Sequence, residues 1–369
     1  MECRRRRPQE EHQPSGAGPV ISAATEPSAG VPVKTGAFCL EGICGAGPFL
    51  RLAYRANAPP QFEETADGGG TLWLPAESSQ ERDPLLIAVA DAAPRREMAV
   101  CSWAGGESLA GIALVRGAAA DLARATQEVY DRLFAAARGY NLCRIWNWVP
   151  DINHSASGDP EEENYRQFCL GRSAAFAASF GDAPERWMPA GTAVGLGGDT
   201  LAVLFAATRA PVGHRENPRQ VPAYRYPALY GPRPPSFARA TITGPTAADD
   251  GSCLFISGTA SIIASESRFP EDLAGQLRVT FENLRLMGVE AGSSAEGVAC
   301  RHFRVYYRRR EDLPAVKDAL RGSLLRKSDR AVFVLADICR RELLVEIEAT
   351  LLMGAGKHGD PWTVPSTRA

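Results

Sequence analysis

A proline-rich stretch at residues 217–239, NPRQVPAYRYPALYGPRPPSFAR, constrains the fold of this chain more than any other segment. Each of its six prolines fixes φ and removes a backbone donor, so the stretch excludes a regular helix and predicts a stiff, extended connection. We call this segment the strap. Its arginines and aromatic residues are interleaved without an acidic residue: Arg219, Arg225, Arg233, Arg239, Tyr224, Tyr226, Tyr230 and Phe237.

The side chains of the strap suit a flat, anionic ligand. Arginine offers a planar fork that matches carboxylate or phosphate, and tyrosine adds an apolar face with a hydroxyl at its tip. The alternative is a connection whose arginines face water. The residue types alone do not separate these two interpretations.

Composition excludes several classes of partner. A net charge of −2 gives no global reason for binding nucleic acid or an anionic membrane. No apolar run approaches the roughly 20 residues that a membrane helix needs. We therefore expect no nucleic-acid partner, no membrane partner and a cytoplasmic location.

The cysteines and histidines do not predict a metal site. The nine cysteines include no CxxC pair, and the five histidines show no ligand spacing. This pattern favours reduced cysteines over a disulfide framework or a zinc site. We expect no bound metal.

Length and patterning predict two folded domains of the α+β class. Helical patterns at about 120–138, 160–180, 271–287 and 312–325 alternate with strand-like runs, so helices should cover one face of a mixed sheet. The segment GLGGD at 195–199 is typical of a hairpin turn. The expected parts are a disordered leader, an N-terminal domain, a C-terminal domain and a flexible tail, at 1–35, 36–180, 181–355 and 356–369.

Two carboxylates mark the last strand-like run, LLVEIEATLL. With a period of two, Glu346 and Glu348 share one face, about 7 Å apart. Flanking leucines indicate burial, and burial together with a like-charged neighbour raises a carboxyl pKa. Such a carboxyl is a usable general acid. The alternative is a pair of glutamates that are solvated or paired with arginines.

Other candidates for chemistry are less specific. On a strand over RHFRVYYRRR (301–310), Arg304, Tyr306 and Arg308 share a face. Arg172 lies in the second predicted helix, where a lone arginine is more often a surface residue than a ligand-binding one. Cys339 is better explained as a small buried residue beside a site than as a nucleophile.

Several long motifs resemble the chorismatases, enzymes that release pyruvate from chorismate. In chain order they are RIWNWVPDIN, YRQFCLGRSAAF, YRYPALYGPRPPSFARA, LFISGTASI, RVYYRRREDLPAV and DICRRELLVEIEA, and the resemblance covers about residues 40–353. It implies a RidA/YjgF-like fold of mixed sheets with helices on one face, in which two related halves imitate a trimer within one chain. It also implies a monomer that works without metal or organic cofactor.

The resemblance also implies roles for individual residues. Glu346 would be the catalytic acid that protonates the enolpyruvyl methylene, and Tyr226 would contact the substrate. Arg144, Arg172, Arg233 and Arg308 would bind the two carboxylates of chorismate. A flat dianion of this kind agrees with the arginines and tyrosines of the strap.

Two small residues are expected to steer the product. By resemblance, Gly258 and Cys339 match the type that forms 3-hydroxybenzoate and pyruvate, whereas alanine at both positions goes with hydrolysis to a dihydroxycyclohexadiene carboxylate. Ala264 and Ser265 stand where the family usually has Gly-His. This departure leaves 4-hydroxybenzoate open as a product.

Two functions of other classes remain as alternatives. One is a RidA-type enamine or imine deaminase, although the key arginine of that family would fall at about Ala331. The other is a non-catalytic module that binds a small ligand or channels an intermediate. Glu346 together with the whole strap favours catalysis over both.

Overall fold

The strand-like runs of the sequence form three β-sheets. The computed structural model describes residues 38–40, 48–56, 58–76, 81–88, 94–244, 252–291 and 298–353. Within this part of the chain, mixed sheets and α-helices confirm the α+β class. The leader expected at 1–35 and the tail expected at 356–369 lie outside the described residues.

The first sheet is all strand, and the other two also carry helices. The first contains β1 (Phe38–Leu40), β2 (Phe49–Ala56), β3 (Gln61–Glu64), β4 (Gly70–Ala76) and β5 (Glu81–Ala88). The second contains β6 (Arg95–Glu97), β7 (Val100–Gly105), β8 (Ser108–Val115), β9 (Asn141–Pro150), β10 (Ala190–Leu196) and β11 (Leu201–Thr208). The third contains β12 (Val212–Arg215), β13 (Ala240–Thr243), β14 (Cys253–Thr259), β17 (Val298–Tyr307), β18 (Arg330–Leu335) and β19 (Val345–Met353). A short hairpin, β15 (Ile262–Ile263) with β16 (Glu266–Ser267), follows β14.

The second and third sheets have the same topology. Their strand orders are β10-β9-β11-β8-β7-β6 and, read in the same direction, β18-β17-β19-β14-β13-β12. In each sheet, the first strand of this order (β10 or β18) pairs in parallel with its neighbour, and the other neighbouring strands are antiparallel. The first sheet repeats part of this order, since β4-β2-β5-β1 matches β10-β9-β11-β8 in direction and in chain order. The related halves therefore share a strand order, and their arrangement as an imitated trimer stays a prediction.

This topology bears on two expectations. The second sheet is completed by β10 and β11, so its strand order is complete near residue 210, between β11 and β12. The division of the chain into domains at 180/181 stays a prediction. The segment 195–199 is not a hairpin turn, because β9 lies between β10 and β11 and pairs with both. A turn-like sequence cannot reveal that a third strand separates its two neighbours.

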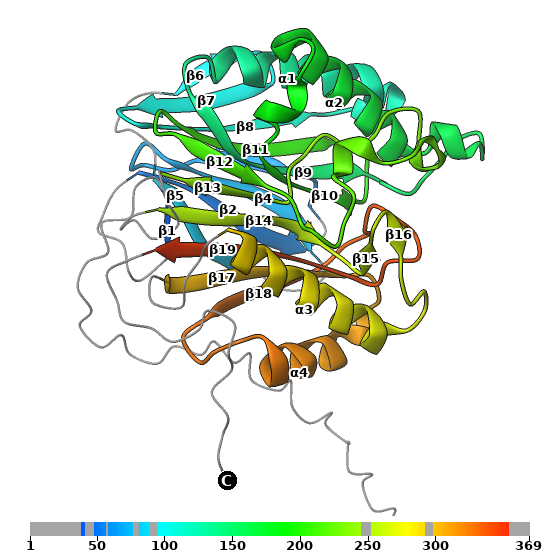
Figure 1. Cartoon of the computed structure of the whole chain (residues 1–369). Helices are drawn as coiled ribbons and strands as arrows, with labels where there is room; N and C mark the ends of the chain where they lie inside the picture. Colours follow the sequence, from blue (N-terminus) through cyan, green and yellow to red (C-terminus); the bar gives the residue numbers. More distant parts are fainter. Residues whose placement is uncertain are drawn as a thin grey trace, which may run out of the picture. The chain divides into compact units, whose positions relative to one another are not determined.

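The helices lie on the outer faces of the two six-stranded sheets (Figure 1). Over the second sheet, α1 (Leu122–Ala136) packs beside α2 (Asn164–Phe180) in one apolar core. Over the third sheet, α3 (Leu273–Glu290) and α4 (Leu313–Ser323) share another. The helices therefore occupy one face of each six-stranded sheet, as predicted.

The inner faces of the three sheets form a common core. Leu52 of the first sheet, Trp146 of the second and Phe255 of the third are buried in one apolar cluster. The rings of Trp146 and Phe255 lie 6.5 Å apart, edge to face. Polar residues that point into this interior are consequently removed from water.

Local signals explain where α1 and α2 begin. The Asp121 carboxylate accepts a hydrogen bond from the Arg124 amide, which is the capping contact that starts α1. Asp159, which directly precedes the helical pattern predicted at 160–180, caps only a single 3-10 turn at Pro160–Glu162. The α-helix proper starts only at Asn164, because Glu163 has an extended ψ of 133°.

The strap is less extended than its prolines predicted. Two single 3-10 turns, Ala223–Arg225 and Ala228–Tyr230, follow Pro222 and Pro227. Proline has the φ that begins such a turn, and the residue before the next proline must return to an extended conformation, which ends it. The prediction that no regular α-helix forms here is confirmed.

No helix in the described part of the chain is long and apolar enough to cross a membrane.

Candidate active site

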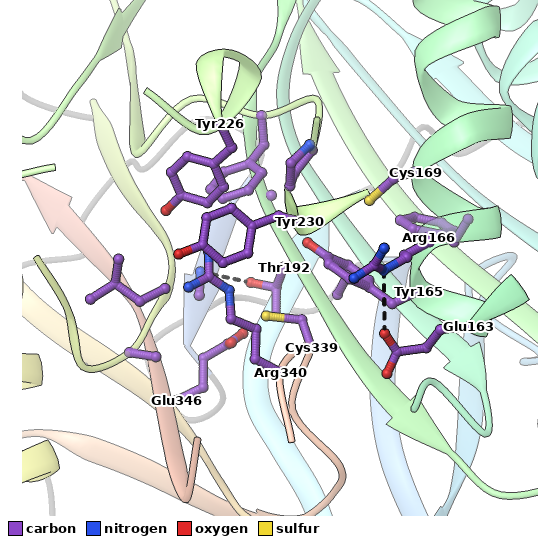
Figure 2. Close-up of a pocket in the computed structure, with 18 of the residues that line it drawn as sticks. Glu163, Tyr165, Arg166, Cys169, Thr192, Tyr226, Tyr230, Cys339, Arg340 and Glu346 are labelled. Carbon is purple, nitrogen blue, oxygen red and sulfur yellow. Dashed lines mark hydrogen bonds and ion pairs between the residues drawn. The ribbon is translucent and has the colours of Figure 1, made fainter. Parts of the chain in front are cut away.

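A cavity of about 390 Å³ lies where β10 of the second sheet meets β14 and β19 of the third (Figure 2). β10 is an edge strand, so one side of its backbone remains available for pairing. Ala238 at the end of the strap bridges to Ala190 of β10, and Ile338 in the loop after β18 bridges to Val194. Both loops are thereby fixed along this edge and close the cavity.

Glu346 lies in the wall of this cavity and is 4% exposed. Burial and the neighbouring Glu348 raise the pKa of its carboxyl to about 8, although Arg144, Arg239 and Arg308 act in the opposite direction. Among the described residues, no side chain forms an ion pair with it. Glu346 is therefore a protonated acid at neutral pH, with its carboxyl on the cavity.

Glu348, two residues further along β19, is in contrast fully paired. Arg144 donates to its Oε2 at 2.7 Å and the indole of Trp146 donates to its Oε1 at 2.8 Å. Thr192 Oγ1 donates at 2.5 Å, and Arg304 also donates to Oε1. Glu348 is therefore part of a buried network of ion pairs and hydrogen bonds.

Arg172 of α2 presents to the cavity a guanidinium that forms no ion pair within the described part of the chain. It is 2% exposed, and its Nε and one of its NH2 groups lack a hydrogen bond among the described residues. Its nearest neighbours are aromatic faces, with Tyr130 at 5.2 Å and Phe168 at 5.8 Å from the guanidinium carbon. Since a buried, unpaired charge is unfavourable, this geometry points to an anionic group supplied by a ligand.

The end of the strap supplies a second arginine to the cavity. Arg239 is 4% exposed and donates to the Tyr226 hydroxyl at 2.6 Å. Its guanidinium also lies 5.1 Å from the ring of Phe237, and its Nε has no hydrogen-bond partner in the described residues. Because its hydroxyl oxygen accepts from Arg239, Tyr226 can donate its own proton to a ligand.

A third arginine comes from the loop after β18. Arg340 stacks on the ring of Tyr230 at 3.8 Å and faces that of Tyr226 at 5.2 Å. One nitrogen donates to the Ser265 carbonyl at 2.8 Å, while the other has no partner among the described residues. Figure 2 shows both tyrosine rings and Arg340 at the same end of the cavity as Glu346.

Known proteins resemble this chain in sequence and in structure. Residues 87–207 match the family described as Chorismatase FkbO/Hyg5-like, N-terminal. A 3-hydroxybenzoate synthase of Streptomyces hygroscopicus is 40% identical over 241 residues, which are 62% of this chain and 69% of that protein. A chorismatase of Streptomyces rapamycinicus is 41% identical over 243 residues, 62% of this chain and 70% of that protein.

The chain belongs to the chorismatase family. A chorismatase crystal structure agrees with this at the level of the fold, with a TM-score of 0.70 and 28% sequence identity, covering 85% of this chain and 97% of that one. The family indicated by the sequence motifs is thus confirmed.

Three arginines that the resemblance assigned to the substrate do not line the cavity of this chorismatase. Arg144 is 1% exposed and is bonded to Glu348 and Thr192. Arg308 donates to the Leu343, Ile338 and Arg340 carbonyls, so it holds the loop that carries Cys339 and Arg340. Arg233 is exposed at the outer side of the strap.

The two predicted steering residues lie beside the acid. A Cβ built on Gly258 would overlap Glu346 Oε1 and lie 2.8 Å from its Cδ. Cys339 also lines the cavity, and burial with the nearby Glu346 raises the pKa of its thiol to about 12. The thiol is therefore neutral, and a role as thiolate nucleophile is disfavoured.

Sequence reasoning missed several cavity residues of the chorismatase. Arg239, Arg340 and Tyr230 were not singled out as substrate contacts, although two of them belong to the strap. Thr192 was also missed, and its Oγ1 accepts a hydrogen bond from the Gly258 amide at 3.0 Å. A signal existed only for Arg239, since it is the strap arginine followed directly by the strand β13.

The far end of the cavity carries a separate charged cluster. Glu163 lies within 3.9 Å of Arg166 and 3.5 Å of Arg341, and Arg166 donates to the Leu229 carbonyl of the strap at 3.2 Å. Figure 2 shows Glu163 and Arg166 well separated from Glu346. In the described residues, no group of histidine, cysteine and acidic side chains is arranged to hold a metal ion.

Proposed function

We propose that this protein cleaves chorismate to pyruvate and 3-hydroxybenzoate. One observation carries the proposal. The same buried cavity is lined by an acid, Glu346, and by a guanidinium, Arg172, and neither forms an ion pair among the described residues. Such a site suits a substrate that is anionic and must receive a proton. The sequence relatives named 3-hydroxybenzoate synthase and chorismatase support the same reaction.

The arginines of the cavity are the proposed carboxylate ligands. Arg172 and the Arg239–Arg340 side of the cavity offer two cationic regions for the two carboxylates of chorismate. Tyr226 and Tyr230 present flat faces to the ring, and their own rings are 5.5 Å apart. Arg172 and Tyr226 keep the roles that the resemblance gave them, whereas Arg239 and Arg340 replace Arg144, Arg233 and Arg308.

Glu346 is the proposed general acid. Protonation of the enolpyruvyl methylene carbon by its carboxyl turns the enol ether into an oxocarbenium-like centre. A carboxyl with a pKa near 8 is still protonated at neutral pH, and so it can deliver this proton without prior reloading. The carboxylate that remains is stabilised by the positive charges of Arg144 and Arg239 nearby.

The proposed fate of the ring follows from the exclusion of water. In the proposed route, the ring's own hydroxyl oxygen bonds to the neighbouring ring carbon as the bond from that carbon to the side-chain oxygen breaks, so pyruvate leaves and the hydroxyl proton returns to the Glu346 carboxylate. The resulting epoxide opens, the carbon that keeps the oxygen loses its hydrogen as a proton, and protonation of that oxygen completes the aromatic product. The two products together contain all the atoms of chorismate. Cys339 fills space beside Glu346 that a nucleophilic water would need, and Gly258, which has no Cβ, leaves room for the Glu346 carboxyl itself. We propose these two residues as the features that favour 3-hydroxybenzoate over the hydrolysis product.

A product assay tests the proposal directly. The protein is incubated with chorismate, pyruvate is followed with a coupled lactate dehydrogenase, and aromatic products are separated by chromatography. We expect equal amounts of pyruvate and 3-hydroxybenzoate. In Glu346→Gln we expect turnover to fall by about 1,000-fold or more. Glu282→Gln is the matched control, since Glu282 pairs with Arg219 outside the cavity.

The other outcomes separate the alternatives. Binding of chorismate without pyruvate release would support a non-catalytic module, and pyruvate with a dihydroxycyclohexadiene carboxylate would support hydrolysis. Full turnover in Glu346→Gln would show that the acid is wrongly assigned. A monomeric state and a cytoplasmic location remain part of this proposal and rest on the sequence and its resemblance.

A further inference from the structure

The first sheet has a buried connection to the active site although it does not reach the cavity. None of the described residues that line the cavity comes from β1–β5. Asp83 of β5 is nevertheless 1% exposed and points into the interior shared by the three sheets. A charged side chain in such a place needs partners, and those partners come from the third sheet.

Asp83 pairs with two side chains of β17, Arg304 and His302. Its Oδ2 accepts from Arg304 Nε at 2.7 Å and NH2 at 2.6 Å. Its Oδ1 lies 2.8 Å from His302 Nε2 and accepts from the Leu85 amide at 2.9 Å. Burial alone would raise the pKa of Asp83, but Arg304 and His302 hold it well below its usual range.

Arg304 passes the connection on to the catalytic strand. Its NH1 donates to Glu348, and Glu348 in turn binds Arg144 and Thr192. The resulting row is Asp83, Arg304, Glu348 and Arg144, and its two carboxylates balance its two guanidinium groups. Glu346 lies two residues before Glu348 on the same face of β19.

We propose that Asp83 is a positioning residue for the reaction: its carboxylate balances the buried arginines and thereby keeps Glu346 in its acid form. Without Asp83, the row would carry one excess positive charge in a region shielded from water. A nearby positive charge favours the ionised form of a carboxyl, and the low polarity of the interior increases this effect. The inference rests on the proposed role of Glu346 as the general acid.

Other charged groups lie near Glu346 and near Arg304, the partner of Asp83. Glu346 is faced by Glu348 on its own strand and by groups of four other elements: Arg144, Arg239, Arg308 and Cys339. Arg304 is also close to Tyr54 of β2 and Tyr306 of β17. Asp83→Asn leaves the groups around Glu346 in place and removes one negative charge beside its direct partners, Arg304 and His302.

The test compares pH profiles of kcat/KM for the wild type and Asp83→Asn. Asparagine retains an acceptor for Arg304 but removes the negative charge. We expect the activity of the wild type to fall with rising pH at about pH 8, which forms the alkaline limb of the profile. In Asp83→Asn this fall should occur at a pH that is lower by about half a unit or more, which means about threefold less activity on the alkaline side. Arg304→Gln changes the balance in the opposite sense and should move the limb to higher pH.

Asp329→Asn is the matched control. Asp329 is a buried carboxylate, 3% exposed, that accepts from Arg301 Nε at 3.0 Å in the same sheet but is not joined to Glu348. Its replacement should lower thermal stability in a comparable way and leave the limb unmoved. This control separates an electrostatic effect on Glu346 from a general loss of stability.

A readout without turnover separates this inference from the proposed function. The infrared carbonyl band of a protonated carboxyl, assigned by its loss in Glu346→Gln, reports the titration of Glu346 whether or not pyruvate is released. A band that titrates at lower pH in Asp83→Asn supports the inference even if chorismate is not the substrate. An unmoved band and an unmoved limb in a folded Asp83→Asn or Arg304→Gln variant would overturn it.

Discussion

Glu346 and Glu348 lie two residues apart on one face of β19, and only Glu348 is paired. Glu348 receives hydrogen bonds from Arg144, Trp146 and Arg304, whereas the carboxyl of Glu346 borders the cavity without an ion-pair partner in the described residues. The paired carboxylate supplies a fixed negative charge that helps to keep its neighbour protonated. Two identical side chains on one strand therefore have different surroundings, and the pKa of only one of them, Glu346, is raised to about 8.

The first prediction concerns thermal stability as a function of pH. Because burial raises the pKa of Glu346 to about 8, its contribution to stability is fully present below the unfolded pKa and is lost as pH rises through the folded pKa. Glu346→Gln cannot titrate. The unfolding free energy of Glu346→Gln minus that of the wild type should therefore increase between about pH 5 and pH 8, by up to about 1.4 kcal/mol per pH unit. The difference in melting temperature should increase in the same direction.

Calorimetry of the two proteins across this range checks the prediction. Glu282→Gln should show no such trend, because Glu282 is 44% exposed on its side chain. A constant difference between Glu346→Gln and the wild type at all pH values would mean that Glu346 is ionised throughout.

The sequence could predict that these two glutamates share a face, because strand periodicity and the flanking leucines are local features. It could not predict which one is paired. The partners of Glu348 come from β9 and β17, and the contact with Arg144 joins residues 204 positions apart in the chain. Only the packing of three sheets around a common core brings these arginines to Glu348 and leaves Glu346 without one.

The second prediction concerns the unpaired guanidinium of Arg172. Arg172→Met removes the charge and keeps most of the volume, so we expect kcat/KM for chorismate to fall about 10- to 100-fold. Stability should rise by about 1–3 kcal/mol, since a buried charge without a partner is removed. Steady-state kinetics and thermal melts measure the two effects on the same preparation.

Arg233→Met is the matched control for this substitution. Arg233 is exposed and lies outside the cavity, so neither kcat/KM nor the melting temperature should change appreciably. An equal loss of activity in both variants would contradict the assignment of Arg172 and restore Arg233 as a substrate contact.

The strap shows a similar limit of sequence reasoning. Its composition suits an anion site, because arginine and tyrosine without acids are suited to that task, but it also allows a connection whose arginines face water. Which arginine faces the cavity depends on the two 3-10 turns and on the bridge between Ala238 and Ala190. These features place Arg239 inward and leave Arg225 and Arg233 exposed, and the only local difference among the three is that Arg239 directly precedes the strand β13.

The third prediction concerns the hydrogen bond between Arg239 and Tyr226. Tyr226→Phe removes the hydroxyl that accepts from Arg239 at 2.6 Å, so the guanidinium loses its orientation at the substrate. We expect about a 10-fold rise in KM and a loss of about 1 kcal/mol of stability. Tyr224→Phe, at a strap tyrosine outside the cavity, should leave KM unchanged. A fall in kcat at constant KM would instead indicate that the Tyr226 hydroxyl acts in the chemical step.

The fourth prediction concerns the product. Cys339→Ala opens space beside Glu346 for water, so the share of dihydroxycyclohexadiene carboxylate should rise at the expense of 3-hydroxybenzoate. Gly258→Ala acts differently, because its Cβ would overlap the Glu346 carboxyl and force it to turn. This variant alone should lower kcat by about 10-fold or more while it changes the product ratio little.

In the double variant, the space opened at residue 339 lets the displaced Glu346 carboxyl settle in a new position with water beside it. We expect hydrolysis to become the main route and part of the activity lost in Gly258→Ala to return, which is a non-additive effect typical of residues that touch the same side chain. Chromatography of the products from all four proteins, with pyruvate as the measure of total turnover, gives both quantities. An unchanged ratio of products in the double variant would refute the role of these two residues, because the space beside the acid would then have no influence on the ring.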